Sequence, residues 1–304
     1  MSLKYGLKWF RYRCLFPTLA FFPERLAYKV ASLIGLFDAR YQGNRPAIQN
    51  GFLTIYPGLS DDTEHLKALT NHYYQMMARD TLDCFRMPSF TKKNTQTLLQ
   101  VHDEDCLKKA QSQGKGVILI ISHFGRFFML GPGLKLSGIE FGMLTTSVDE
   151  TNPHYDAIDR WYVAKKLFNT QLFSRGSWFT TADSPRKTYQ ALKQGEIILI
   201  AMDGIETNSS TRFHFPFLGG TLTLPEGIVR IAEKTGAKIV FGHAMEQGRS
   251  VHIRLFQLPD DPYTALQQSV KQLEQDVTAH PWQWWQWAAL ASLWHRETHL
   301  SHSE

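Results

Sequence analysis

Cysteine is scarce in this chain of 304 residues, which has only Cys14, Cys84 and Cys106. Three widely spaced cysteines exclude a disulfide framework and a cysteine-based metal site, and they fit a reducing compartment. The fold must therefore depend on an apolar core. With 43% hydrophobic and 20% charged residues, the chain can bury such a core as one large domain or as two modest ones.

Long apolar runs are also lacking. A helix needs roughly 20 consecutive apolar residues to cross the hydrocarbon core of a bilayer. The apolar segment near the N-terminus covers only residues 14–22, between Arg13 and Pro23. No small-residue cleavage site follows this segment, so we expect neither a spanning helix nor a secretory signal.

An excess of positive charge is lacking beyond residue 50. The net charge of the whole chain is +5, and residues 1–50 hold eight Lys or Arg residues against Glu24 and Asp38. The remainder is therefore close to neutral, which excludes a generally basic surface, and we expect no nucleic-acid partner. An anionic partner is expected near the N-terminus, where the cations are Lys4, Lys8, Arg11, Arg13, Arg25, Lys29, Arg40 and Arg45.

The first residues also carry an apolar stripe at helical spacing, beside three of these cations. The stripe consists of Leu3, Leu7, Phe10 and Cys14, and the cations beside it are Lys4, Lys8 and Arg11. This pattern predicts an element that lies in the interface of an anionic membrane. The alternative is an amphipathic helix that docks on the core and leaves a basic face in water. Trp9, Phe21 and Phe22 favour membrane docking, because they are large apolar groups for so short a basic segment.

The rest of the chain has the pattern of an α/β fold. Residues 60–86 begin with a Ser-Asp-Asp cap signal and keep helical periodicity. Beyond residue 116, nearly continuous apolar runs alternate with helical stretches, which predicts a mixed, mostly parallel sheet covered by helices. The expected strands are 117–121, 141–148, 196–202, 237–244 and 251–258, the last two forming an antiparallel pair, and the expected helices are 154–168, 184–194, 225–236 and 263–279.

Two polar residues follow strands at the edge of this sheet where chemistry is expected. His123 comes just after the run VILIIS, and Asp203 comes just after EIILIAM. In parallel sheets, functional groups collect outside the carboxyl ends of the strands. If the two strands are parallel and close together, an imidazole and a carboxylate meet there. The alternative for His123 alone is an ordinary hydrogen-bonded loop residue.

Five blocks of the sequence resemble one enzyme family, and they follow in the right order. HFGRFFMLGPGLKLSG is similar to the His-Phe-Gly block of the bacterial lipid A late acyltransferases (lauroyl/myristoyl transferases), and ALKQGEIILIAMDG is similar to their Leu-x-x-Gly-strand-Asp segment. The other three blocks are IQNGFLTIYPGLSDDTEHLKALTNHYYQMM, FHFPFLGGTLTLPEGIVRIAEKTGAKIV and HPWQWWQW. The resemblance covers about residues 45–287.

The resemblance implies a glycerolipid-acyltransferase-like fold and the transfer of an acyl group from a thioester to a hydroxyl or amine. In that family a His-x4-Asp/Glu pair works as a base held by a carboxylate. Here His123 matches the base, whereas Phe128 occupies the position of the acid. A phenyl ring can neither accept the imidazole N–H nor offset the charge of an imidazolium.

Three interpretations of Phe128 remain open at this point. Another carboxylate replaces the missing acid, the histidine acts without an acid on an easily activated amine, or the site is inactive and the fold is kept for binding. Loss of the orienting carboxylate of a catalytic histidine can cost about four decades in rate, which keeps the inactive alternative in view. Asp203 is the first candidate for a replacement acid, and Asp149, Glu150 and Glu206 are the others.

Four cations lie where the resemblance implies basic residues near the reacting acyl group. They are Arg126, Lys165, Lys166 and Arg175. Cations at such positions bind a phosphopantetheine phosphate or a developing oxyanion. The alternative, above all for Lys165 and Lys166, is a solvated charged face. Phe127 and Phe128 either line an acyl-chain pocket or pack in the core.

The hypothesis from the sequence is therefore an acyltransferase that uses His123 as general base and Asp203 as its carboxylate. The expected donor is an acyl–acyl carrier protein or acyl-coenzyme A thioester, and the acceptor is a lipid A-like glycolipid or another small molecule. We expect no bound cofactor or metal. Residues 1–90 are expected to form a helical membrane-proximal region on the cytoplasmic face of the inner membrane, continuous with an α/β acyltransferase-like domain over residues 91–304. The alternative is an inactive lipid-binding or scaffold protein.

Overall fold

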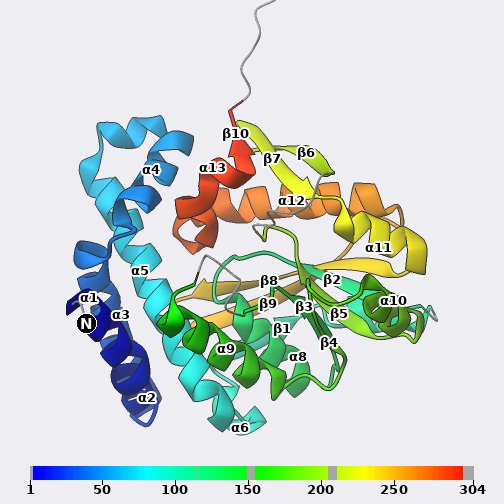
Figure 1. The fold of residues 1–304 in the computed structure, drawn as a ribbon, viewed down its shortest axis with the longest axis horizontal. Helices are drawn as coiled ribbons and strands as arrows, with labels where there is room; N and C mark the ends of the chain where they lie inside the picture. The colour runs from blue at the N-terminus through cyan, green and yellow to red at the C-terminus, as the bar shows by residue number, and fades with distance from the viewer. Residues whose placement is uncertain (1–2, 114, 149–154, 205–210, 297–304) are drawn as a thin grey trace, which may run out of the picture.

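The N-terminal part of the protein is helical. A computed structural model describes residues 3–113, 115–148, 155–204 and 211–296. The helices α1 to α5 form one end of the molecule (Figure 1), and α5 begins behind the expected cap, since Asp62 accepts the backbone N–H of His65 at 2.9 Å. These helices are α1 (Leu3–Phe10), continued by a π-helical turn over Arg11–Leu15, α2 (Phe16–Leu19), α3 (Glu24–Tyr41), α4 (Arg45–Ile55) and α5 (Thr63–Arg86).

A seven-stranded sheet fills the centre of the molecule, in the order β1-β9-β8-β2-β5-β3-β4. The pairs β8/β2, β2/β5, β5/β3 and β3/β4 are parallel, and β8 and β9 are antiparallel. The mixed, mostly parallel sheet is therefore confirmed, including the antiparallel pair. Its strands are β1 (Leu99–His102), β2 (Val117–Ile121), β3 (Gly142–Thr145), β4 (Trp178–Thr180), β5 (Ile197–Ala201), β8 (Lys238–Gln247) and β9 (Ser250–Gln257).

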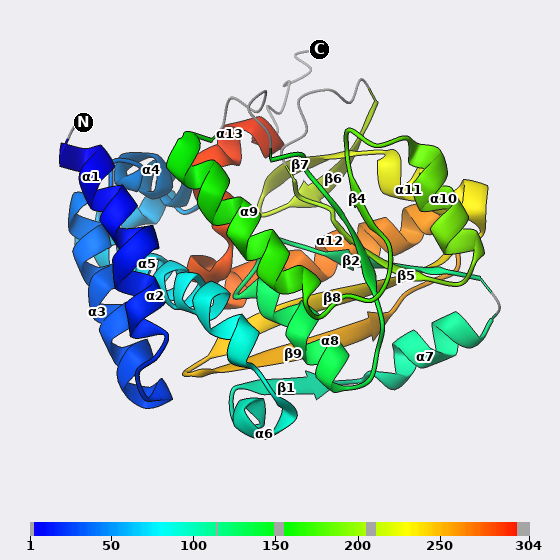
Figure 2. The ribbon, with the colours of Figure 1, turned by 60° about the horizontal axis from the view of Figure 1, so that its bottom comes forward.

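Helices cover both faces of this sheet (Figure 2). The central strand β2 is buried along its whole length, because its side chains alternate between two apolar clusters. Val117, Leu119 and Ile121 belong to the cluster shared with α7, α8 and α2, whereas Ile118 and Ile120 belong to the cluster shared with α10, α11 and α12. The covering helices are α7 (Asp105–Ser112), α8 (Leu130–Leu136), α9 (Ala157–Gln171), α10 (Pro185–Lys193), α11 (Gly227–Thr235) and α12 (Pro262–Ala279).

A small second sheet was not expected from the sequence. Its order is β10-β7-β6, and both pairs are antiparallel. The segment FHFPFLGGTLTLP forms the hairpin β6/β7, in which Leu218 and Gly219 occupy left-handed backbone conformations at the turn. The elements of this region are β6 (Arg212–Phe217), β7 (Gly220–Pro225), β10 (Trp294–His295) and α13 (Leu290–Leu293), and a short helix α6 (Lys92–Thr95) precedes β1.

The apolar core joins the N-terminal helices to the sheet. One buried cluster contains Phe16 and Ala27 together with Leu119 of β2, and the other contains Phe52 together with Phe241 of β8. Apolar packing therefore crosses the expected boundary at residues 90 and 91.

Candidate active site

His123 and Asp203 meet at the carboxyl edge of the central sheet. The strands β2 and β5 are parallel neighbours in which Ile121 pairs with Ala201. Each polar residue lies two positions beyond its strand, so the register places them side by side. His123 Nδ1 lies 2.8 Å from Asp203 Oδ1. The convergence predicted from the strand ends is confirmed.

Asp203 is fully buried and bound from several directions. Its carboxylate accepts the backbone N–H of His123 at 2.9 and 3.1 Å and the indole N–H of Trp284 at 3.0 Å. Gln286 donates to its backbone carbonyl at 2.7 Å. Burial opposes ionisation of this carboxyl, but the charge and hydrogen bonds of His123 and the indole of Trp284 outweigh it and lower the pKa of Asp203. Asp203 is therefore an anion held in one orientation.

The imidazole of His123 has Nδ1 on Asp203, and within the described residues no hydrogen bond involves its Nε2. Because Nδ1 faces the carboxylate, Nδ1 is the nitrogen that carries the proton in the neutral ring, and Nε2 has the lone pair. The ring stacks edge-on against Phe127, with 4.9 Å between the centroids. Its side chain is 25% exposed, and it lines a cavity of about 260 Å³.

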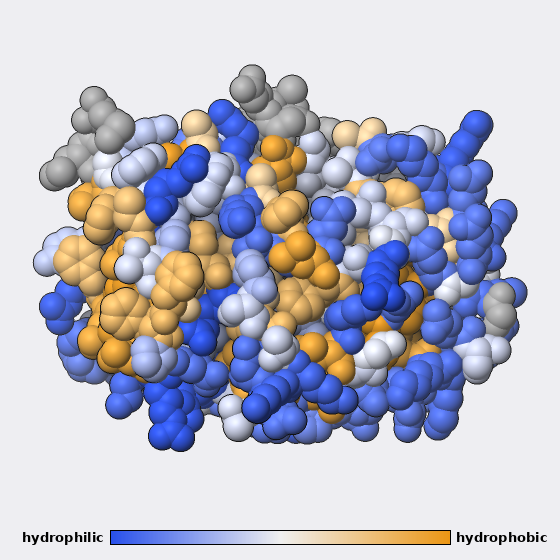
Figure 3. Space-filling model, turned by 90° about the horizontal axis from the view of Figure 1, so that it is seen from below, coloured by the Kyte–Doolittle hydropathy of each residue, from blue (hydrophilic) through white to orange (hydrophobic). Residues whose placement is uncertain are grey.

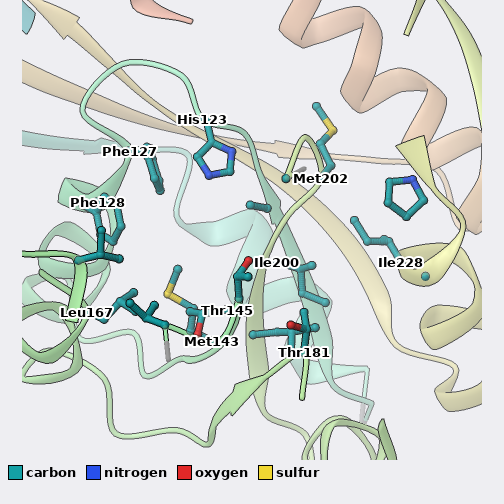
Figure 4. A pocket seen from close by; sticks show the side chains of 18 of the residues that line it. His123, Phe127, Phe128, Met143, Thr145, Leu167, Thr181, Ile200, Met202 and Ile228 are labelled. Carbon is teal, nitrogen blue, oxygen red and sulfur yellow. The ribbon is translucent and has the colours of Figure 1, made fainter. Parts of the chain in front are cut away.

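This cavity is largely apolar. Figure 4 shows the His123 ring at one end, Phe128 and Leu167 along one side, and Met202 and Ile228 on the other. The walls come from β3, β5, α9 and the start of α11. Further apolar lining residues are Phe127, Met143, Leu144, Val148, Val163, Ile200, Ala201, Pro225 and Ile231. An apolar space of this volume beside an imidazole can hold a hydrocarbon chain with its reacting end near the ring.

The turn behind His123 is fixed by a glycine. Gly125 has φ +62°, and a Cβ atom at this position would collide with the backbone carbonyl of Ala244. The Gly125 N–H donates to the carbonyl of Gln283 at 2.8 Å, and the indole of Trp285 donates to the Gly125 carbonyl at 2.8 Å. The turn is thus held through its backbone between β8 and the Trp-rich segment, residues 280–287.

Arg126, predicted to contact substrate, lies inside the protein. Its guanidinium is fully buried and donates to both carboxylate oxygens of Asp83 at 2.6 Å each. It also donates to the hydroxyl of Tyr28 at 3.1 Å and to the backbone carbonyl of Arg249 at 3.1 Å. The structure therefore places its charge in an internal network that ties the turn after β2 to α5 and α3.

Lys166, also predicted to bind substrate, is buried beside the cavity. Its ammonium pairs with Asp80 and lies 4.0 Å from the centroid of Phe128 and 4.8 Å from that of Trp285. Burial raises the pKa of Asp80 above its ordinary value, although the nearby Lys166 ammonium opposes the shift. Phe128 thus separates the buried cation from the cavity.

The remaining predicted site residues are not brought to His123. Lys165 is half-buried, with its ammonium 5.4 Å from the ring of Phe168. Arg175 is exposed at the amino-end side of the sheet, ahead of β4, where it pairs with Glu140 at 3.3 Å. Of the alternative acids, Asp149, Glu150 and Glu206 lie outside the described residues.

The polar contacts of the Trp-rich segment near the C-terminus were missed. Trp284 and Gln286 both donate hydrogen bonds to Asp203, and the sequence predicted no polar contact for either residue. The indole and amide donors of HPWQWWQW could have predicted hydrogen bonds to the site, because a buried indole N–H group needs an acceptor. Sequence order alone does not say which acceptor they reach.

Comparison with known protein families gives one match for this chain. The family model described as bacterial lipid A biosynthesis acyltransferase matches residues 1–294. The chain belongs to this family. No match is found among curated proteins. Membership of this family supports an acyltransferase activity in lipid A biosynthesis.

Within this acyltransferase fold, large apolar side chains are exposed mainly at one end. Figure 3 shows apolar side chains gathered at the end where Figure 1 places α1 to α3. In the part of the chain that the structure describes, no helix is both long and apolar enough to span a bilayer. The exposed groups are Leu7, Trp9, Phe10, Phe21, Phe22, Leu26, Leu33, Phe37 and Tyr41, with Phe168 and Leu172 on and just after α9 and Tyr263 on α12.

Two of the cations expected beside this apolar stripe are used inside the acyltransferase. Lys8 pairs with Asp156 at 2.7 Å and with Asp159 at 2.5 Å, which fastens α1 to α9. Arg11 pairs with Asp38 of α3. These contacts hold the short basic segment on the protein, and acidic side chains neutralise two of its charges.

Proposed function

We propose that this protein transfers a fatty acyl group from an acyl–acyl carrier protein or acyl-coenzyme A thioester to a hydroxyl or amine. The acceptor we propose is a lipid A-like glycolipid or another small molecule. The observation that carries the proposal is the buried Asp203 carboxylate bound to Nδ1 of His123, at the end of an apolar cavity. Membership of the lipid A acyltransferase family supports the same class of reaction.

His123 serves as the general base in this proposal. Its Nε2 takes the proton from the acceptor hydroxyl or amine while the acceptor oxygen or nitrogen attacks the thioester carbonyl. The carbon–sulfur bond breaks, and the thiolate leaves and receives the proton from the imidazolium. Asp203 holds the ring and offsets its positive charge, which is the task of the carboxylate in other His–carboxylate pairs. The apolar cavity holds the acyl chain, and Phe127 and Phe128 form its wall near His123.

Phe128 supports Asp203 as a replacement acid. A phenylalanine at the position of the family's acid leaves His123 without a carboxylate from its own turn, and Asp203 already occupies Nδ1. The same substitution favours one other function, in which the fold binds acyl chains without turning them over. An acyltransferase needs His123 to form an acylated product, whereas a protein that only binds acyl chains forms no such product.

The test is transfer measured by intact mass, with acyl–acyl carrier protein and acyl-coenzyme A as donors and a panel of glycolipid and amine acceptors. We expect His123→Gln to lose transfer by about three decades or more, with a melting temperature close to that of the wild type. His65→Gln, which changes an exposed histidine on α5 outside the cavity, is the matched control. Full transfer by His123→Gln contradicts the general-base role. A wild type that binds the acyl donor but acylates no acceptor supports the binding function.

We also propose peripheral docking on the cytoplasmic face of the inner membrane. The apolar side chains exposed over α1 to α3 support this placement. Docking brings the cavity within reach of a lipid acceptor while a carrier protein or coenzyme A delivers the donor from the aqueous side.

A further inference from the structure

A second hollow lies among the N-terminal helices and is lined by cations. It has a volume of about 370 Å³ and is formed by α3, the first residue of α4, and α5. Arg40, Arg45 and Lys67 line it together with the polar groups of Thr70 and Asn71, and its two apolar lining residues, Leu36 and Ala39, are on α3. None of these residues lines the cavity beside His123. We call this hollow the basic cleft.

The two arginines of the basic cleft lack an acidic partner in the described part of the chain, in contrast to Arg11, which pairs with Asp38. Among the described residues, neither Arg40 nor Arg45 has a side-chain ion pair or hydrogen bond, and Nε of Arg45 is buried without a partner. Arg11 and Arg86 also have an unpaired Nε. Each of those two, however, donates through another guanidinium nitrogen, Arg11 to Asp38 and Arg86 to backbone carbonyls. A buried, unpaired guanidinium donor is costly, and an anion in the cleft removes that cost.

Lys67 and the N-terminus of α4 add to the positive potential of the basic cleft. The one ion pair of Lys67 within the described residues is with the exposed Glu64, one turn away on α5, at 3.2 Å. Arg45 is the first residue of α4, and Asn44 before it accepts the hydroxyl of Tyr74 at 2.6 Å and makes no cap. The positive end of the α4 dipole thus adds to the charge of the two guanidiniums.

The position of the basic cleft indicates where the anion comes from. Arg40 lies on α3 within one turn of Phe37 and Tyr41, which are both exposed, and Leu33 extends the same exposed face. Apolar groups that enter the interface of a membrane place neighbouring cations at the depth of the lipid phosphates. We propose that the basic cleft binds the phosphate of a membrane lipid headgroup and so sets how the protein sits on the bilayer. This inference builds on the proposed membrane docking.

The experiment compares Arg40→Gln/Arg45→Gln with Lys108→Gln/Lys187→Gln, which removes the same charge from α7 and α10 at the far end of the molecule (Figure 2). Binding is measured to vesicles of phosphatidylcholine with and without phosphatidic acid. At about 1 kcal/mol for each cation near the surface, the cleft variant should bind phosphatidic acid vesicles about tenfold or more weakly. The control variant should change less than about threefold, because its charges lie farther from the membrane than a Debye length. Equal losses in the two variants would overturn the proposal.

Inorganic phosphate separates a lipid headgroup from a free anion. If phosphate raises the melting temperature of the wild type but vesicle binding is the same in the wild type and the cleft variant, the cleft serves a soluble anion and the headgroup assignment is overturned. If the cleft variant loses affinity for the acidic acyl carrier protein and keeps its vesicle binding, a protein partner replaces the lipid.

The last arm separates this inference from membrane docking itself and from misfolding. A wild type that binds no vesicle overturns both docking and the headgroup assignment, whereas vesicle binding that ignores phosphatidic acid overturns the headgroup assignment alone. Arg45→Lys keeps the positive charge at position 45. If the cleft acts through its cations, this variant should bind phosphatidic acid vesicles more tightly than Arg40→Gln/Arg45→Gln does. No recovery, in a variant with the wild-type melting temperature, contradicts an electrostatic role for position 45.

Discussion

His123 and Asp203 form an imidazole–carboxylate pair from two neighbouring strands, whereas Phe128 is the residue at which the resemblance to the family predicts an acid. Positions 203 and 128 contact different groups. Asp203 reaches Nδ1 of His123 directly, while the Phe128 ring lies over the ammonium of Lys166. A carboxylate introduced at position 128 would therefore meet Lys166 before it met the imidazole.

This geometry predicts that Phe128→Glu does not replace Asp203. Asp203→Asn should lower turnover by about four decades, because an amide no longer offsets the imidazolium and favours the wrong tautomer. Adding Phe128→Glu should restore less than about tenfold of that loss, because the new carboxylate pairs with Lys166. Rates of acyl transfer and melting curves for both variants test this, and Phe128→Leu controls for the lost ring. Recovery to near the wild-type rate would show that position 128 still reaches His123.

The lowered pKa of Asp203 predicts how stability depends on pH. In the unfolded chain the carboxyl has its ordinary pKa of 3.8, and in the folded protein its pKa is lower. The folded state thus binds fewer protons in this range. The stabilisation from Asp203 is complete above pH 3.8 and is lost as the pH falls through the folded pKa. As the pH falls below about 4, the free energy of unfolding should therefore fall more steeply for the wild type than for Asp203→Asn. Parallel denaturant titrations at each pH measure the two slopes, and identical slopes would contradict the assignment.

The turn after β2 is held to α5 by a buried ion pair, so the helical region helps to shape the site. Removing one partner leaves a buried charge uncompensated, and Arg126→Met should lower the free energy of unfolding by about 3–5 kcal/mol. Removing both should cost less, because Arg126→Met/Asp83→Leu replaces the pair with apolar groups. Denaturant melts of the single and double variants measure this difference. A double variant as unstable as the single one would mean that the pair is not what holds the turn.

The distribution of exposed apolar side chains concerns the whole molecule, because it defines one end that is unlike the rest. Leu33→Ser/Phe37→Ser removes two exposed groups from α3, so folding stability should change little. Vesicle binding should weaken by about tenfold or more, since each side chain loses roughly 1.5 kcal/mol or more of apolar burial in the interface. Tyr263→Ser on α12 is the control and should bind as the wild type does. Flotation with vesicles measures all three, and unchanged flotation of the α3 variant would place docking elsewhere.

The local order of the sequence determined the main secondary structure. Apolar runs predicted β2, β3, β5, β8 and β9 within three residues at each end, and the cap before α5 marked that helix. The strands β1 and β4 were missed, because β1 (LQVH) alternates with polar residues over four positions and β4 has only three residues. The hairpin β6/β7 was also missed, because its prolines and glycines obscure the alternation of a strand. The predicted lipid A acyltransferase family is confirmed, since motif order is a property of the sequence itself.

The sequence by itself determined that a histidine and a carboxylate end two buried strands, because apolar runs and their polar ends are local patterns. Only the tertiary structure decided that β2 and β5 are adjacent, which joins His123 to Asp203. It also decided the positions of the cations: Arg126 and Lys166 are buried on carboxylates, Arg175 lies at the opposite edge, and Arg40 and Arg45 share a cleft. The partners of a long charged side chain come from elements distant in the chain, and no local pattern specifies them.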